Sequence, residues 1–253
     1  MINLFKGIRR RLWSDKNFTK YVLYAIGEIV LVVIGILIAL QINNWKEQQK
    51  LNQLQTVYLE RMVNDLSQDL LNFDNVIKDI EANQQAITKF IEVLDSGVAT
   101  EAILPDILGF YERGWIISDF APTENTYIDL SQTGNMKVIE NTQLVNEIIE
   151  YYGYMDIVEG SANVNTMWIT PIDQAVAKET ASFEIDPNTA HLFQEKDKTK
   201  AIKNLLLNKE LMQRDAAGHY WINTSLKGNL EAMKNLSVAL KEAIENELKA
   251  IKE

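Results

Sequence analysis

The sequence contains no cysteine, which excludes disulfide bonds, thiolate metal ligands and cysteine nucleophiles. It also lacks the His-Glu-x-x-His zinc motif, the Glu-x-x-His motif of di-iron bundles, the phosphate-binding P-loop, the GxGxxG fingerprint and the nucleophile elbow. Its two histidines, His191 and His219, lie in unrelated contexts, and we interpret both as structural or exposed residues rather than ligands. We therefore expect no catalytic residue, no metal site and no cofactor, and we do not expect an enzyme.

Proline and glycine are also scarce, with 4 and 11 residues among 253. Few helix breakers, together with many Leu, Ile, Ala, Glu, Lys, Asn and Gln residues, favour helix throughout. No segment alternates apolar and polar residues over a convincing strand length, and no repeat of fixed period is found. The composition therefore predicts an all-α protein, and 47% hydrophobic residues are ample for a core.

One long stretch carries almost no charge. Residues 21–42, YVLYAIGEIVLVVIGILIALQI, contain a single charged side chain, Glu28. As a helix this stretch is about 33 Å long at ~1.5 Å per residue, which matches the hydrocarbon thickness of a bilayer. We predict a transmembrane helix over residues 21–42, so the lipid bilayer is an expected partner.

The charge is distributed unevenly around this stretch. Residues 1–20 carry a net charge of +5, and the total of −10 leaves −15 for residues 21–253. Because basic flanks stay on the cytoplasmic side, we expect residues 1–20 to be a cytoplasmic basic amphipathic segment and residues 43–253 to lie outside. A cleavable signal peptide is the alternative, but the apolar run is long and no small-x-small cleavage site follows it. The acidic body argues against nucleic acid as a partner.

Small residues and one carboxyl group mark one face of the predicted span. Gly27, Gly35 and Ala39 recur at intervals of eight and four residues. Small residues let the backbone of a second helix approach closely, so a homo-oligomer packed through this stripe is expected. Glu28 lies next to the stripe, where a buried charge costs roughly 2.5–3.5 kcal/mol on insertion scales. It either pairs or exchanges a proton in an oligomer, or it is hydrated from the cytoplasmic side.

Beyond the span, no glycine or proline occurs until Gly97, so the helix can continue directly into the external part. Its apolar residues recur at alternating spacings of four and three, with one polar member: Leu59, Val63, Leu66, Leu70, Phe73, Ile77, Ile80, Gln84, Ile87, Ile91 and Leu94. Such a seam packs either in a coiled coil or in a helical bundle. Because later helices can supply the partners, a bundle within one chain is favoured.

Further helices are expected at residues 104–113, from 123 or 124 to 131, from a cap at Asn141 or Thr142 toward 181, and from 205 or 208 to 251. Pro171 is expected to kink or interrupt the third. The fold class is therefore all-α. One N-terminal transmembrane helix continues into a long helix of an extracytoplasmic antiparallel helical bundle over residues 43–253.

Polar and aromatic residues gather around a turn at Gly134. They form a possible recognition patch, made of Tyr127, Asp129, Gln132, Gly134 and Asn135. A tight turn between two helices explains the same residues, because glycine supplies the positive φ that ends a helix, and we favour that packing role. Asp65 and Asp69, four residues apart, could bind a cation, although a solvated helix face is the preferred interpretation.

The stretch YAIGEIVLVVIGILIALQINNWKE resembles the N-terminal signature of a family of single-span membrane proteins common in Bacteroidota, domain of unknown function 6090. The later run TYIDLSQTGNMKVIENTQLVNEIIEYY resembles its second recurring block, in which an aromatic residue precedes a Leu-Ser-x-x-Gly-Asn turn and a helix ending in paired tyrosines. The resemblance implies a bacterial inner-membrane location and a helical external domain. It implies no activity, ligand or catalytic residue.

Three functional hypotheses follow. The leading one is a non-enzymatic interaction or assembly component, in which a membrane-anchored homo-oligomer presents its acidic external bundle to a protein partner. The second is a periplasmic sensor that binds a small ligand between its helices. The third is an ion-coupled membrane component, in which Glu28 takes up and releases a proton.

Overall fold

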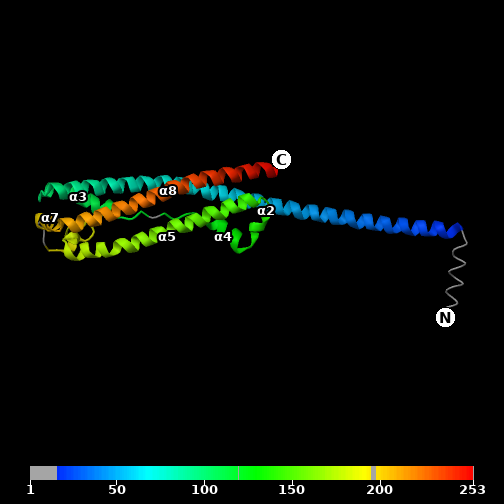
Figure 1. Ribbon diagram of the computed structural model, residues 1–253, viewed down its shortest axis with the longest axis horizontal. Helices are drawn as coiled ribbons and strands as arrows, with labels where there is room; N and C mark the ends of the chain where they lie inside the picture. The colour runs from blue at the N-terminus through cyan, green and yellow to red at the C-terminus, as the bar shows by residue number, and fades with distance from the viewer. Residues whose placement is uncertain (1–15, 119, 195–197, 253) are drawn as a thin grey trace, which may run out of the picture. The chain divides into compact units, whose positions relative to one another are not determined.

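The computed structural model describes residues 16–118, 120–194 and 198–252, and within these ranges all regular structure is helical (Figure 1). The elements are α2 (Lys16–Ser96), η1 (Glu101–Ile103), α3 (Leu104–Gly109), η2 (Phe110–Gly114), α4 (Asn125–Gln132), η3 (Asn135–Val138), α5 (Thr142–Glu179), α6 (Ser182–Ile185), η4 (Ala190–Leu192), α7 (Lys198–Leu207) and α8 (Lys209–Lys252). The predicted all-α class is confirmed. The amphipathic segment predicted for residues 1–20 lies outside the described residues, except for the first residues of α2.

The chain divides between Gln55 and Thr56 into two compact units. In the first unit, α2 is exposed throughout residues 22–50. An 18-residue window of this helix has a mean hydropathy of 2.7 and is 0% buried. By length and composition, α2 is the one helix in the described ranges that could cross a membrane. As predicted, it continues without a break far beyond the apolar stretch and ends at Ser96, just before Gly97 with its φ of 65°.

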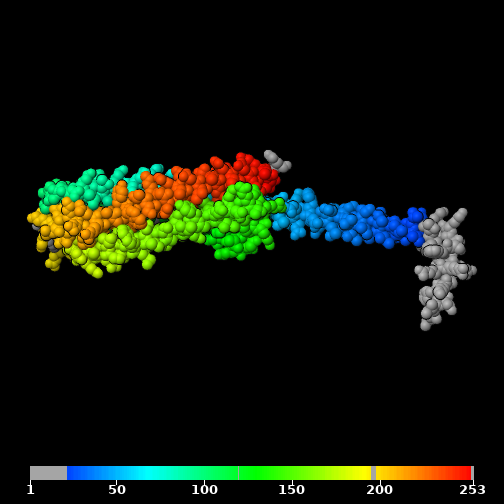
Figure 2. Space-filling model, in the orientation of Figure 1, coloured from blue at the N-terminus to red at the C-terminus, as the bar shows by residue number. Residues whose placement is uncertain are grey.

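In the second unit, α8 runs antiparallel to α2. Side-chain contacts that advance along α2 retreat along α8, in the order Asp74–Lys234, Glu81–Lys227, Gln84–Thr224 and Asp95–Gln213. α8 is antiparallel to α5 as well, because Tyr151 contacts Ser237 and Asp173 contacts His219. Figure 2 shows α8, in orange and red, directly against α5, in yellow-green.

The predicted antiparallel arrangement therefore holds for α8, whereas α5 runs parallel to α2. The parallel direction arises because the chain returns along the bundle through the extended segment between η2 and α4 (Figure 1). A short loop between α2 and α5 would have forced them to be antiparallel. The return segment also carries Trp115, Ser118 and Thr123, which contact the long helices.

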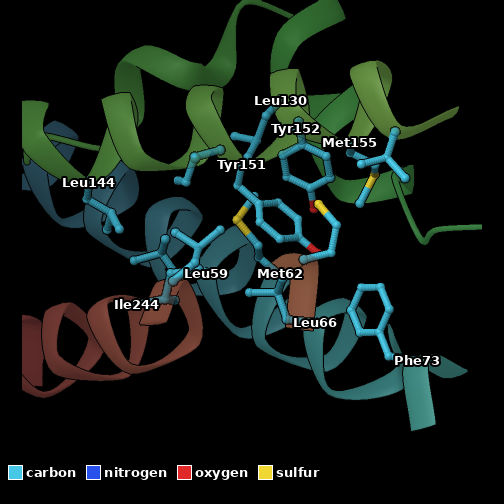
Figure 3. Packing of buried hydrophobic residues seen from close by; sticks show 14 of the residues in the cluster. Leu59, Met62, Leu66, Phe73, Leu130, Leu144, Tyr151, Tyr152, Met155 and Ile244 are labelled. Carbon is cyan, nitrogen blue, oxygen red and sulfur yellow. The ribbon is translucent and has the colours of Figure 1, made fainter. Parts of the chain in front are cut away.

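Two separate apolar clusters fill the second unit. The α4 cluster joins α2, α4, α5 and α8, and includes Leu59, Leu66, Phe73, Leu130, Tyr152 and Ile244 (Figure 3). The α3 cluster joins α2, α3, η2, α7 and α8, and includes Ile87, Phe90, Phe110, Ile202 and Met212. In the α3 cluster, the Phe90 and Phe110 rings stack with their centroids 4.2 Å apart.

The buried positions of α2 agree with the predicted seam at only one of the two positions in each heptad. One residue per heptad is fully buried as expected: Leu59, Leu66, Phe73, Ile80, Ile87 and Leu94. Between them, the buried residues Met62, Asp69, Asn83 and Phe90 each lie one residue before a predicted position, so the buried polar residues here are Asp69 and Asn83 rather than Gln84. The partners are α5 and α8 of the same chain, as the bundle alternative required. The prediction missed this rotation because it counted only apolar residues, and two of the buried positions are polar.

The beginning of α5 follows the sequence closely. The Asn141 side-chain oxygen accepts hydrogen bonds from the backbone N–H groups of Gln143 and Leu144, at 3.1 and 3.2 Å, as an N-cap does. Pro171 does not interrupt the helix, which continues to Glu179. Proline removes one backbone hydrogen bond, but the fully buried Ile169 and Val176 hold both sides of it against the bundle.

Core packing of α2 predicts a contrast between two leucines of the same helix. Leu66→Ala should lower the free energy of unfolding by about 2–5 kcal/mol, because Leu66 is 0% exposed and its removal leaves a cavity. Leu71→Ala is the matched control and should change it by less than about 0.5 kcal/mol, since Leu71 is 62% exposed. Denaturant unfolding of the full chain in detergent, followed by circular dichroism, measures both; equal losses would contradict this packing.

Candidate functional site

A layer of polar side chains separates the α4 cluster from the α3 cluster. This polar layer consists of Asn83 on α2, Trp115 and Ser118 on the return segment, Asp173 on α5, and Asp215, His219 and Asn223 on α8. On α2 it falls between Ile80 of one cluster and Ile87 of the other. The core of this unit is therefore apolar at both ends and polar in between.

Three ionisable residues meet in this layer, and we call them the Asp–His cluster: Asp173, Asp215 and His219. Asp215 and His219 are four residues apart on α8, so both project from one face of that helix. His219 Nε2 lies 3.0 Å from Asp173 Oδ1, and one ligand atom from each residue lies within 4.8 Å of the others. The side chains of Asp215 and His219 are almost completely buried, whereas Asp173 is 28% exposed.

A close approach of two helices positions the cluster. A Cβ atom at Gly218 would collide with Cδ1 of Ile169, so α8 lies close to α5 here and a larger residue would require the Ile169 side chain to move. Two neighbours then hold the ligand-bearing residues. Trp115 Nε1 donates to Asp173 Oδ1 at 3.3 Å, and Asn223 Nδ2 donates to the His219 backbone carbonyl at 2.8 Å.

The cluster concentrates polar atoms that lack hydrogen bonds. Among the described residues, neither buried carboxylate oxygen of Asp215 has a donor and Nδ1 of His219 has no partner; the buried hydroxyls of Tyr111, Tyr152 and Ser182 lack partners as well. Leaving a buried polar group unsatisfied costs about 1–3 kcal/mol, and more for a charged one. Most buried groups of this kind in native proteins have a partner, so this concentration calls for a ligand or a proton.

The electrostatics of the cluster favour the binding of one positive charge, either a proton or a cation, between the carboxyl groups of Asp173 and Asp215. Burial, and then the neighbouring carboxylate of Asp173, raise the pKa of Asp215 to about 8. Burial also acts to raise the pKa of Asp173, but the hydrogen bond from His219, and then the proton that Asp215 holds, outweigh it and leave that pKa below its usual range. Burial and the charge of Asp215 raise the pKa of the Tyr111 hydroxyl. The site can therefore hold either a proton between two carboxylates or a cation.

Sequence reasoning interpreted His219 as a structural or exposed residue and did not identify Asp173 and Asp215 as its partners. The available signal was the spacing of Asp215 and His219, because two ligand types four residues apart on a helix share a face. Asp173 gives no comparable signal. It lies 42 residues before Asp215 on a different helix, and only the packing of α5 against α8 brings it near.

The predicted assembly residues of the span lie exposed in the first unit. Gly27, Glu28, Gly35 and Ala39 are all exposed on α2. Nothing in the described chain lies within 4 Å of a Cβ atom built on Gly27 or Gly35. The small-residue stripe is thus uncovered. The homo-oligomer and the role of Glu28 stay predictions.

The possible recognition patch is engaged in contacts within the chain. Tyr127 stacks on Tyr152, with ring centroids 4.1 Å apart, and Asp129 pairs with Arg61 at 3.0 Å. Asn135 Nδ2 donates to the hydroxyl of Tyr58 at 2.8 Å. Gly134 adopts a φ of 69°, as the turn requires, and Gln132 is exposed. These contacts tie α4 and η3 to α2 and α5, as the packing role predicts.

The interpretation of Asp65 and Asp69 as a solvated helix face is wrong. Asp69 is buried and accepts hydrogen bonds from the backbone N–H and the hydroxyl of Thr123, at 3.1 and 2.8 Å. Asp65 accepts one from the hydroxyl of Thr126. The two carboxylates hold the end of the return segment and the start of α4 against α2, which no sequence spacing reveals.

A hollow of about 350 Å³ lies in the second unit between the return segment, α5 and α8. Its wall is mixed, with Phe120, Val158 and Leu226 beside Ser118 and Glu159. Its volume falls within the range of small-ligand sites. The sensor hypothesis would use such a hollow, and it stays a prediction.

Fold and site together define the class: an all-helical protein with one helix apolar enough to cross a membrane and a helical unit with a polar layer in its core. A family model described as "Family of unknown function (DUF6090)" matches residues 28–103. This match confirms the resemblance over the first block, from residue 28 of α2 to the end of η1, whereas the second block, at residues 126–152, lies outside it. Comparison with curated proteins and with solved structures gave no match.

The buried pair Asp69 and Thr123 generates a pH-dependent prediction. Thr123→Val should lower the free energy of unfolding by about 1–2 kcal/mol at pH 7, because it removes one donor to a buried carboxylate. Burial raises the pKa of Asp69, and the hydrogen bonds from Thr123 oppose that rise. The variant's folded pKa should therefore be higher still, and its deficit should shrink as the pH falls through that value and the carboxyl group becomes protonated.

Denaturant unfolding of both proteins between pH 3 and pH 7 measures this deficit. Thr88→Val is the control, since the Thr88 hydroxyl donates to a backbone carbonyl on an exposed part of α2. A deficit that stays constant with pH would contradict the assignment.

Proposed function

We propose that this chain is a single-pass membrane protein whose helical unit acts as a non-enzymatic assembly component, with a second copy of the same chain as its first partner. The observation that carries the proposal is apolar surface that the described chain itself leaves uncovered. Such surface is unusual in a soluble monomer and marks contact with a membrane or another protein.

The first uncovered surface is the apolar part of α2. Its large hydrophobic side chains between Val22 and Ile42 are exposed, and its length suits a bilayer. The basic residues 1–20 and the acidic remainder favour an N-terminus in the cytoplasm and a periplasmic helical unit. The location we propose is accordingly the bacterial inner membrane.

The second uncovered surface runs along the outer side of α5. Four members recur at spacings of three and four residues, at Ile157, Gly160, Val164 and Met167, and Trp168 and Pro171 continue the same side; none carries a charge. We call them the α5 stripe. Trp221 of α8 extends the stripe, and its ring centroid lies 5.6 Å from that of Trp168, both side chains being 54% exposed. Exposed tryptophans are enriched at the centres of protein interfaces.

The net charge of the chain and its proposed membrane anchor favour a second copy of the chain as the partner that covers the α5 stripe. Residues 21–253 carry a charge of −15, so two copies repel each other except where an uncharged face is available. The α5 stripe supplies such a face. Two copies paired through Gly27, Gly35 and Ala39 would also share one membrane, which raises the effective concentration of their helical units. A different protein partner on the acidic surface is the alternative outcome of the test.

The oligomeric state tests the proposal. The purified full chain in detergent should have a protein mass of at least two chains of 28.9 kDa by light scattering. Gly35→Leu and Met167→Glu should each shift the population toward the monomer, because one blocks close helix packing and the other places a charge on the α5 stripe. Thr170→Glu, on another face of α5, is the control for Met167→Glu and should leave the mass unchanged. A monomeric wild-type chain would refute self-assembly.

The proposed topology has a separate test. Alkaline phosphatase fused after Glu253 should be active, because that enzyme folds only outside the cytoplasm. Replacing Arg9, Arg10 and Arg11 with glutamate should lower its activity, since the cytoplasmic side is then no longer marked by positive charge. If the fusion to the wild-type chain is expressed normally but inactive, the helical unit lies in the cytoplasm and the proposed topology is wrong.

A further inference from the structure

The geometry points to a divalent transition-metal site at Asp173, Asp215 and His219, in the polar layer of the second unit. This site goes beyond the proposed assembly role and does not depend on it, because all three residues belong to one helical unit of one chain. It also departs from the expectation, based on sequence motifs, that no metal would bind.

The donor atoms have the spacing that a metal requires. A metal ion binds imidazole nitrogen and carboxylate oxygen at about 2.0–2.2 Å, so neighbouring donors lie about 3–3.5 Å apart. His219 Nε2 and Asp173 Oδ1 are 3.0 Å apart, and one donor atom of Asp215 completes a group within 4.8 Å. A small movement of the Asp215 carboxylate oxygen toward the other two donor atoms would let all three bind one ion.

Asp215 provides a second and independent indication of a ligand. Its side chain is 0% exposed, and in the described parts of the chain neither of its carboxylate oxygens accepts a hydrogen bond. Two carboxylates side by side in a buried site repel each other, and a divalent cation between them would remove the repulsion and satisfy the oxygens.

The surroundings support loading and orientation of the site. Asp173 is 28% exposed, which gives an ion a route from solvent to the two buried ligands. Trp115 Nε1 donates to Asp173 and thereby fixes the direction of its carboxylate, as outer hydrogen bonds commonly do for metal ligands. α5 and α8 also pack closely beside the site, where the Ile169 side chain lies against Gly218.

The donor set selects a class of ion. One imidazole with two carboxylates and no thiolate suits Zn²⁺, Mn²⁺ or Fe²⁺, whereas Mg²⁺ and Ca²⁺ prefer oxygen ligands alone. Three protein ligands leave at least one position for water. In its number of protein ligands the site therefore resembles metal sites that keep one coordination position open for water. The number of ligands alone does not imply catalysis.

Metal binding to the intact protein tests the inference. The full chain, purified in detergent without a polyhistidine tag and stripped with a chelator, is dialysed against Zn²⁺ alone and against Mn²⁺ alone. We expect saturable binding of one equivalent per chain to at least one of these ions, undiminished by millimolar Mg²⁺. The midpoint of thermal unfolding should rise with that ion, because binding stabilises only the folded state.

Variants locate the bound ion. Asp215→Asn and His219→Gln should each weaken binding at least tenfold and abolish the thermal shift, with unchanged helicity by circular dichroism. His191→Gln removes the other histidine, which is exposed on η4, and should bind like the wild type. If a cluster variant fails to fold, the stoichiometry and thermal shift of the wild-type chain still show whether one ion binds to the folded protein.

Two results would overturn the site. One is the absence of stoichiometric Zn²⁺ or Mn²⁺ binding to the wild-type chain, which would leave Asp173 and Asp215 sharing a proton instead. The other is binding that His191→Gln abolishes or that both cluster variants retain, which would place the ion elsewhere. Neither result bears on the oligomeric state, so failure of this inference and failure of the assembly role are distinguishable.

Discussion

The burial of the carboxylate of Asp215 between helices α5 and α8 constrains the second unit more than any other single feature. A carboxyl group whose oxygens have no donor is costly in a protein interior, so the neighbours of Asp215 must lie at a fixed level along both helices. Sliding α8 by one turn along α5 would set Asp215 and His219 beside Ile169 or Val176, which offer no polar partner. The polar layer therefore fixes the register that the two apolar clusters alone would leave loose.

That register explains the division of the core. The clusters on either side supply most of the apolar burial and hence the driving force for folding. Between the clusters, α8 packs against α5 at Gly218. Trp115 and Ser118 of the return segment contact the polar layer through Asp173 and Asn83. α5 shows the consequence most clearly. It is apolar on its inner side and again along the α5 stripe, so it lacks the single polar face that a solvent-exposed helix normally has.

The sequence predicted the helices well where local signals are strong. The continuous α2, the stop at Gly97, the turn at Gly134 and the cap at Asn141 all follow from glycine, proline and capping chemistry within a few residues. It failed where the deciding contact is remote. Asp69 and Asn83 were not placed in the core, because an isolated polar residue on a helix is ordinarily solvated. Their burial is tolerable because remote side chains, Thr123 for Asp69 and Ser118 for Asn83, supply hydrogen bonds. The separate helix α7 and the parallel direction of α5 were missed for the same reason.

By itself, the sequence determined that this protein is helical, that residues 21–42 are apolar enough to span a membrane, and that charge is segregated across that stretch. These properties depend on composition and on neighbours a few residues apart, which set helix propensity and hydropathy directly. Only the tertiary structure decided which face of α2 is buried and which ionisable groups meet. Asp173 joins Asp215 and His219 because α5 and α8 pack closely at Gly218, and that proximity is a property of two helices together.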